Sequence, residues 1–151
     1  MAGLYFDNCC LNRPFDDQTQ PRIRLEAEAI LVILRQIEQG THSWIASDAL
    51  DIEIRRSPDK MRQERVRALA STASSHVKLG TIEARRAKEV GEMGFGAYDA
   101  LHIACAESGK AEVLLTTDDK LIRRAAARST ELHIRVVNPL VWLTESGMKE
   151  Q

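Results

Sequence analysis

Short runs of apolar residues alternate along the chain with longer segments in which apolar and polar residues are mixed. Each run is short enough to be a buried strand and ends at polar or turn-forming residues. On this pattern we predict strands at residues 4–6, 44–46, 77–79, 112–117 and 134–137. The first strand is predicted to end in a polar loop at Asp7 and Asn8.

The longer segments carry the signals of helices. Pro21 opens one of them, where its missing N–H costs nothing, and Gly40 ends it. Further helices are predicted at residues 48–57, 59–73, 81–93, 97–108 and 120–128, with a short one around Trp142. Strands that alternate with helices form a parallel sheet covered on both faces, so we predict an α/β fold.

Size and composition limit the classes of protein. A chain of 151 residues is expected to form one domain, residues 1–151. Its formal net charge of −1 argues against a general polyanion binder, and 5% aromatic residues are too few for a stacking platform on single-stranded nucleic acid. No apolar stretch is long enough to cross a membrane.

The cysteines give an expectation about the compartment. Their count, 3, is odd, and Cys9 and Cys10 are adjacent, which disfavours a disulfide between them. No pair has the spacing of a zinc motif. We therefore expect a cytoplasmic protein in which these two cysteines are small core residues.

Four acidic residues fall where the chemistry of an open parallel sheet collects, at the carboxyl ends of the strands. Asp7 follows the first strand and Asp118 follows the fourth. Glu53 lies in the helix after the second strand, and Asp99 begins the mostly apolar helix before the fourth strand. These residues meet only if the first strand is central, between the second and the fourth, and we predict that order.

Carboxylates that converge on one site repel one another, and folding alone gives no reason for such an arrangement. A hard cation such as Mg²⁺ or Mn²⁺ does, because it prefers oxygen ligands. Such an ion polarises a phosphoryl oxygen and lowers the pKa of bound water. The sequence therefore favours metal-assisted hydrolysis of a phosphodiester, with Asp7, Glu53, Asp99 and Asp118 as catalytic metal ligands.

Each acid also has a purely structural interpretation, and these alternatives stay open. Asp7 fits an Asx turn, whereas Asp99 and Asp118 fit the starts of helices. Glu53 fits a solvated helix face.

Two neighbouring residues are further candidates. Asp119 is an alternative to Asp118, because the sequence does not fix the end of the strand. His102 lies three residues after Asp99, on nearly the same helix face, and is either a ligand or a supporting histidine at the edge of the core.

The order of these residues resembles the PIN-domain family, and the toxin nucleases of VapC type within it. The matching segments are Leu4-Tyr5-Phe6-Asp7, Ser47-x-x-Leu50-x-x-Glu53, Tyr98-Asp99-Ala100-Leu101-His102-Ile103-Ala104, Leu114-Leu115-Thr116-Thr117-Asp118 and Val136-Val137-Asn138-Pro139. The resemblance implies a three-layer α/β/α sandwich around a central parallel sheet. It also implies Mg²⁺- or Mn²⁺-dependent cleavage of RNA, with the four acids holding the metal.

The resemblance further implies contacts that support the metal ligands. A hydroxyl residue such as Thr117 supports the site in this family. Many relatives also carry a hydroxyl residue after the first aspartate, where this chain has Asn8 and Cys9. We therefore expect Thr117 and Asn8 to lie around the metal ligands.

Basic residues follow two of the acids. One group comes after Glu53 and includes Arg55 and Arg56, and another comes after Asp118. Such charges fit either a solvated helix face or a cradle for the RNA backbone. Arg55 and Arg56 are the best candidates for RNA binding, because they follow Glu53 by less than one helical turn.

Two kinds of protein partner are expected. A toxin nuclease needs a protein that silences it, so the resemblance implies an antitoxin. The helix opened by Pro21 has two apolar stripes, and one sheet face covers only one of them. We therefore also expect a homodimer.

Two other functions compete with the nuclease. A PIN-like module that has lost catalysis would act through partners alone, but all four acids are present. A metal-dependent phosphatase of another α/β class needs an acid two residues after Asp7, where the chain has Cys9. Neither glycine pattern of the nucleotide-binding motifs occurs.

Overall fold

The sheet is parallel throughout. The structure, a computed structural model, describes residues 2–150 and the side chains of residues 2–146. Within this range one 5-stranded sheet has the order β3-β2-β1-β4-β5. Its strands are β1 (Ala2–Phe6), β2 (His42–Ser47), β3 (Ser75–Val77), β4 (Val113–Leu115) and β5 (Arg135–Val137). The predicted central place of the first strand, between the second and the fourth, is confirmed.

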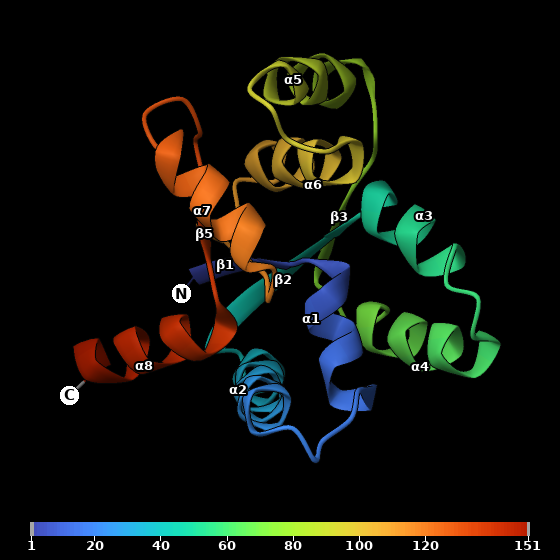
Figure 1. The fold of residues 1–151 in the computed structure, drawn as a ribbon, viewed down its shortest axis with the longest axis vertical. Coiled ribbons are helices and arrows are strands. Elements are labelled where there is room, and N and C mark those ends of the chain that lie inside the picture. Colours follow the sequence, from blue (N-terminus) through green and yellow to red (C-terminus); the bar gives the residue numbers. More distant parts are fainter. Residues whose placement is uncertain (1, 151) are drawn as a thin grey trace.

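Helices connect the strands and cover both faces of the sheet. They are α1 (Asn8–Asn12), the 3₁₀ turn η1 (Arg13–Phe15), α2 (Pro21–Glu38), α3 (Asp48–Arg55), α4 (Lys60–Ala70), α5 (Thr81–Glu92), α6 (Ala97–Ser108), α7 (Asp119–Ala127) and α8 (Pro139–Glu150). In Figure 1, α5 and α6 lie above the sheet, and α2 and α8 lie below it. The three-layer α/β/α sandwich is therefore confirmed.

The central strand explains the two layers. Tyr5 is buried in an apolar core with residues of α5, α6 and α7, whereas Leu4 and Phe6 are buried in a second core with residues of α2, α4 and α8. Successive side chains of a strand point to opposite faces, so a strand covered on both sides is apolar at every position. None of the helices in the described range is long and apolar enough to cross a membrane.

Two elements differ from the sequence prediction. The predicted polar loop after Asp7 is the short helix α1, because Cys10 and Leu11 are fully buried and hold this segment against the core. β3 is Ser75–Val77 rather than residues 77–79, because it pairs with the end of β2 as an exposed edge strand. An edge strand needs fewer apolar residues, so the apolar run was a poor guide to its position.

Gly109, at the end of α6, lies where this helix crosses β2 and β3. A Cβ atom here would lie 2.8 Å from Ile45 Cγ2 and 2.8 Å from Val77 Cγ2. Because both neighbours belong to strands, we expect Gly109→Ala to lower the free energy of unfolding by about 1–3 kcal/mol. Gly91 is the matched control, since a Cβ there has nothing within 4 Å, and Gly91→Ala should be neutral or stabilising. Urea unfolding compares the variants, and equal stability of the two would contradict the expected clash.

Candidate active site

Asp7 lies at the carboxyl end of the central strand. Its N–H donates to the carbonyl of Leu115 at 2.9 Å, so the contact between β1 and β4 extends to this residue. The buried carboxylate accepts a hydrogen bond from Thr116 Oγ1 at 2.9 Å. The same hydroxyl accepts the N–H of Asp118 at 3.1 Å. One fully buried hydroxyl thus links the two acids that follow neighbouring strands.

Glu53 is brought to this edge by α3. The helix begins as predicted at Ser47, whose Oγ accepts the N–H of Leu50 at 3.1 Å. Oε1 of Glu53 lies 2.9 Å from His102 Nε2, and that nitrogen is 3.8 Å from Asp7 Oδ1. The imidazole of α6 therefore lies between the acid of α3 and the acid of β1.

The other ring nitrogen of His102 is held from the core. Nδ1 lies 2.6 Å from the Tyr5 hydroxyl, which is itself 2.6 Å from Ser47 Oγ. Burial lowers the pKa of His102, but its hydrogen bond to Glu53 and the nearby carboxylates outweigh burial and raise that pKa. The role of Tyr5 was not predicted from the sequence. The one available signal was a tyrosine in a short apolar run, because a buried tyrosine hydroxyl needs a hydrogen-bond partner.

Asp99 lies in the first turn of α6. Burial raises the pKa of its carboxyl group, and the negative charges of the other three acids raise it further, to about 6, against the opposing effect of His102. Ligand atoms of Asp7 and Glu53 lie within 4.8 Å of each other and of His102. Asp118 is linked to Asp7 through the Thr116 hydroxyl. That all four acids hold one metal stays a prediction.

The two aspartates after β4 have different surroundings. Asp118 caps α7, since its Oδ1 accepts the N–H groups of Lys120 and Leu121 at 3.0 and 3.3 Å. Asp119 instead forms a two-pronged ion pair with Arg22, with both distances 2.8 Å. The hydrogen bonds from Arg22 hold the pKa of Asp119 below its usual range. Asp118 is therefore a helix cap whose N–H shares the Thr116 hydroxyl with Asp7, whereas Asp119 is paired with Arg22.

The supporting hydroxyl is that of Thr116, one residue before the predicted Thr117. Leu115 pairs with Phe6, so Thr116 comes level with Asp7. The N–H of Thr117 donates to Cys9 Sγ at 3.4 Å, and that thiol is 3.5 Å from Asp7 Oδ2. Two threonines stand side by side in the sequence, and only the register of β4 against β1 shows which hydroxyl reaches the acid.

The remaining predicted residues lie near the cysteine pair. Cys10 is fully buried, as expected of a small core residue, while Cys9 is half-buried beside the acid. Asn8 Oδ1 accepts a hydrogen bond from Asn12 Nδ2 at 3.1 Å. Asn8 also lines a cleft of about 540 Å³ together with Glu53.

Arg56 lines the same cleft as Glu53. Its guanidinium group lies over the ring of Tyr98, 5.4 Å from the ring centre, and donates to the Tyr98 hydroxyl. A positive charge therefore lies in the same cleft as the Glu53 carboxylate, where it can pair with a phosphate of a bound nucleic acid.

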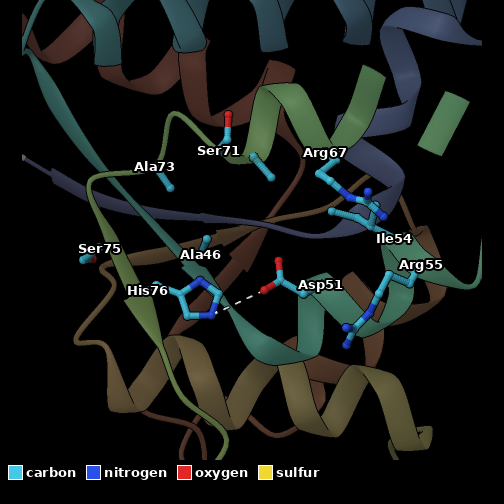
Figure 2. Close-up of a pocket in the computed structure, with 10 residues that line it drawn as sticks. Ala46, Asp51, Ile54, Arg55, Arg67, Ser71, Ala73, Ser75 and His76 are labelled. Carbon is cyan, nitrogen blue, oxygen red and sulfur yellow. Dashed lines mark ion pairs between the residues drawn. The ribbon is translucent and has the colours of Figure 1, made fainter. Parts of the chain in front are cut away.

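Arg55 lines a separate pocket of about 600 Å³, together with Asp51, Arg67 and His76 (Figure 2). His76 forms an ion pair with Asp51 at 3.5 Å in this pocket. Residues two apart on a helix do not face the same side, so Arg55 and Glu53 belong to different surfaces of α3. The structure thus separates the two arginines that the sequence grouped together.

The donor atoms of the site suit a divalent cation. One ligand atom each of Asp7, Glu53 and His102 lie within 4.8 Å of one another. Carboxylate oxygens suit Mg²⁺ and Mn²⁺, and Mn²⁺ also accepts imidazole nitrogen. The protein is therefore an α/β protein with an acidic site at the carboxyl edge of its parallel sheet, and the donor atoms of this site fit a divalent cation.

Comparison with known proteins gives the family. The model of the PIN domain matches residues 7–127, a range that includes all four acids. The chain therefore belongs to the PIN-domain family, which confirms the resemblance seen in the sequence. No curated protein matches the sequence of the chain.

Two solved structures share the fold. The crystal structure of FitAcB from Neisseria gonorrhoeae superposes with a TM-score of 0.57 at 12% identity, covering 90% of this chain and 97% of that chain. The crystal structure of VapBC2 from Rickettsia felis, bound to a DNA fragment from their promoter, gives a TM-score of 0.55 at 10% identity, with coverage of 90% and 97%. At these identities the likeness is one of fold.

Proposed function

We propose that the chain, as one domain of residues 1–151, is a metal-dependent endoribonuclease of the cytoplasm. Asp7, Glu53, Asp99 and Asp118 hold Mg²⁺ or Mn²⁺. The observation that carries this proposal is geometric: ligand atoms of Asp7, Glu53 and His102 lie within 4.8 Å of one another. When bound, the cation supplies a water of lowered pKa and neutralises charge on the phosphate.

The residues around the acids orient them for this task. Thr116 donates to Asp7 and so fixes one carboxylate against the end of the sheet. His102, itself held by Tyr5, fixes Glu53. A site whose ligands are held before the substrate arrives loses less free energy on binding metal and substrate.

The proposal is tested by RNA cleavage with added Mg²⁺ or Mn²⁺ and with a chelator. Cleavage should require the metal and should be lost in Glu53→Gln. Asp51→Asn is the matched control, because Asp51 lies on the same helix but lines the separate pocket. Metal binding without cleavage of any RNA would instead favour the catalytically silent module. Metal-dependent hydrolysis of small phosphate monoesters alone would favour the phosphatase.

The two arginines should contribute unequally to RNA binding. Arg56→Ala should weaken binding and reduce the slope of log K against log salt by about one, the value for one lost phosphate contact. Arg55→Ala should change the slope less, because Arg55 lines a pocket apart from Glu53. Fluorescence anisotropy over a salt series, with chelator present to prevent cleavage, measures both slopes. Equal effects of the two substitutions would show that the cleft with Arg56 is not the path of the RNA.

We also propose that the nuclease is the toxin of a toxin–antitoxin pair. Family membership and the VapC-type pattern of the acids support this. Expression of the chain should then arrest growth of the host cell, and expression of Asp7→Asn should not. Co-expression with the antitoxin, sought among the products of adjacent genes, should restore growth. Growth arrest that Asp7→Asn also causes would contradict a nuclease toxin.

A homodimer is expected from the surface of α2. Leu25 and Val32 of the second apolar stripe are 46% and 39% exposed, and Leu31 beside them is 48% exposed, so the helix carries uncovered apolar surface. Sedimentation velocity of the protein alone should show a dimer, and Leu31→Lys should shift it toward monomer. A monomer at high concentration in both proteins would contradict the expectation.

A further inference from the structure

We infer that His102 is itself a ligand of the cation, through Nε2, so that the metal centre combines a nitrogen with carboxylate oxygens. This inference rests on the proposed function. It goes beyond it by adding a residue of different chemistry to the four acids and by predicting which cation the site prefers.

The spacing of the donor atoms supports a shared ion. Two ligands at about 2.1 Å from one octahedral ion lie about 3.0 Å apart when adjacent and about 4.2 Å apart when opposite. His102 Nε2 is 2.9 Å from Glu53 Oε1 and 3.8 Å from Asp7 Oδ1. The first distance matches that of adjacent ligands and the second lies between the two values, so a small movement of Asp7 brings all three side chains onto one ion.

The far side of the imidazole ring supports the same role. A metal-binding histidine usually donates its other ring N–H to a fixed acceptor, which sets the tautomer and the ring orientation. The Tyr5 hydroxyl stands 2.6 Å from Nδ1 and has its own acceptor in Ser47 Oγ, 2.6 Å away. With Nδ1–H donating to Tyr5 and Tyr5 donating to Ser47, Nε2 is the ring nitrogen that faces the carboxylates and meets Glu53.

The burial of His102 makes this arrangement informative. Only 1% of the residue is exposed, and it lies in a helix whose other buried residues are mostly apolar. In the metal-free protein a proton on Nε2 is donated to Glu53, 2.9 Å away, and a bound cation would take the place of that proton between the ring and the two carboxylates. A proton that stays on Nε2 when the cation binds would make His102 a positioning residue only.

A nitrogen ligand changes the metal preference. Mg²⁺ is suited to carboxylate, carbonyl and water oxygens, whereas imidazole favours transition metals. The site should therefore bind Mn²⁺ at least about tenfold more tightly than Mg²⁺, because Mg²⁺ gains little from an imidazole ligand. His102→Gln should remove most of this preference, because it leaves only oxygen donors toward the metal.

The inference is tested by pulsed electron paramagnetic resonance of bound Mn²⁺, which detects a directly bonded nitrogen as an electron spin echo modulation. Wild-type protein should show the modulation of ¹⁴N, and protein labelled with ¹⁵N-histidine should show that of ¹⁵N instead. His102→Gln should lose the signal. The labelled wild-type protein decides the question even if this variant does not fold.

His76 provides the matched control, because together with Asp48 and Asp51 it forms a second group of donors. The modulation should survive in His76→Gln. A modulation lost in that variant and kept in His102→Gln would overturn the inference. So would Mn²⁺ binding without any nitrogen signal, an outcome that leaves the proposed nuclease intact. Absence of any Mn²⁺ binding, measured by titration calorimetry, would overturn both.

Discussion

Asp7→Asn should reduce metal-dependent RNA cleavage by at least about 10²-fold in kcat, equivalent to about 2.7 kcal/mol of transition-state stabilisation. Asp7 ends the central strand and approaches Thr116 and His102. Asparagine keeps the shape and an oxygen that accepts from Thr116, so the fold should persist while the charge is lost. The defect should therefore appear in cleavage and in metal affinity rather than in stability.

Three measurements check this result together. Single-turnover cleavage at saturating RNA gives the rate, calorimetric titration with Mn²⁺ gives the metal affinity, and urea unfolding gives the stability. Asp51→Asn provides the control for loss of a carboxylate elsewhere, on α3 in the separate pocket. Cleavage by Asp7→Asn within about threefold of the wild-type rate would remove Asp7 from the metal ligands.

Asp99→Asn should combine a severe loss of cleavage with equal or greater stability of the metal-free protein. The pKa of Asp99 is raised from 3.8 to about 6, so its ionised form is unfavourable in the folded state. The penalty is fully present above pH ~6 and disappears as the pH falls below ~4, because the carboxyl is then protonated in both folded and unfolded protein. At pH 7 the variant should gain on the order of 1 kcal/mol, allowing for solvent screening of this half-buried group.

The pH and the metal separate this explanation from simple helix capping. The stability difference between Asp99→Asn and the wild type should shrink as the pH is lowered from 7 toward 4. Added Mn²⁺ should raise the melting temperature of the wild type more than that of the variant, because binding to the folded state stabilises it. A helix-start role predicts instead a loss of about 0.5–2 kcal/mol in Asp99→Ala with no dependence on metal. That pattern would place Asp99 outside the site.

The sequence predicted the fold because its strands are short apolar runs with clear ends. The acids at those ends also specified the strand order, since Asp7 and Asp118 meet only if their strands are neighbours. The short helix α1 was missed because Cys10 and Leu11 are too few for a helical pattern, and their burial is visible only in the packed core. β3 was misplaced because its pairing with β2, rather than its own residues, determines its position.

Side-chain contacts within the site were harder to predict than the acids themselves. Thr116 and Thr117 are equivalent in the sequence until the register with β1 distinguishes them. Tyr5 and His102 lie 97 positions apart in the chain, so no local sequence pattern predicts their hydrogen bond. These contacts depend on how neighbouring strands and helices are aligned with one another. Neither the composition nor the residue spacing of the sequence gives this alignment.

The link that Thr116 makes between Asp7 and Asp118 has a consequence for how this site can change during evolution. The linking atom is a hydroxyl on the β-carbon, and only threonine and serine carry one. Valine would fill the same buried space but would leave Asp7 without its donor and the N–H of Asp118 without its acceptor. Thr117 contacts Cys9 through its backbone N–H, so this contact does not require a hydroxyl at position 117. Descendants of this chain that remain active can therefore drift at the second threonine while the first is confined to two amino acids.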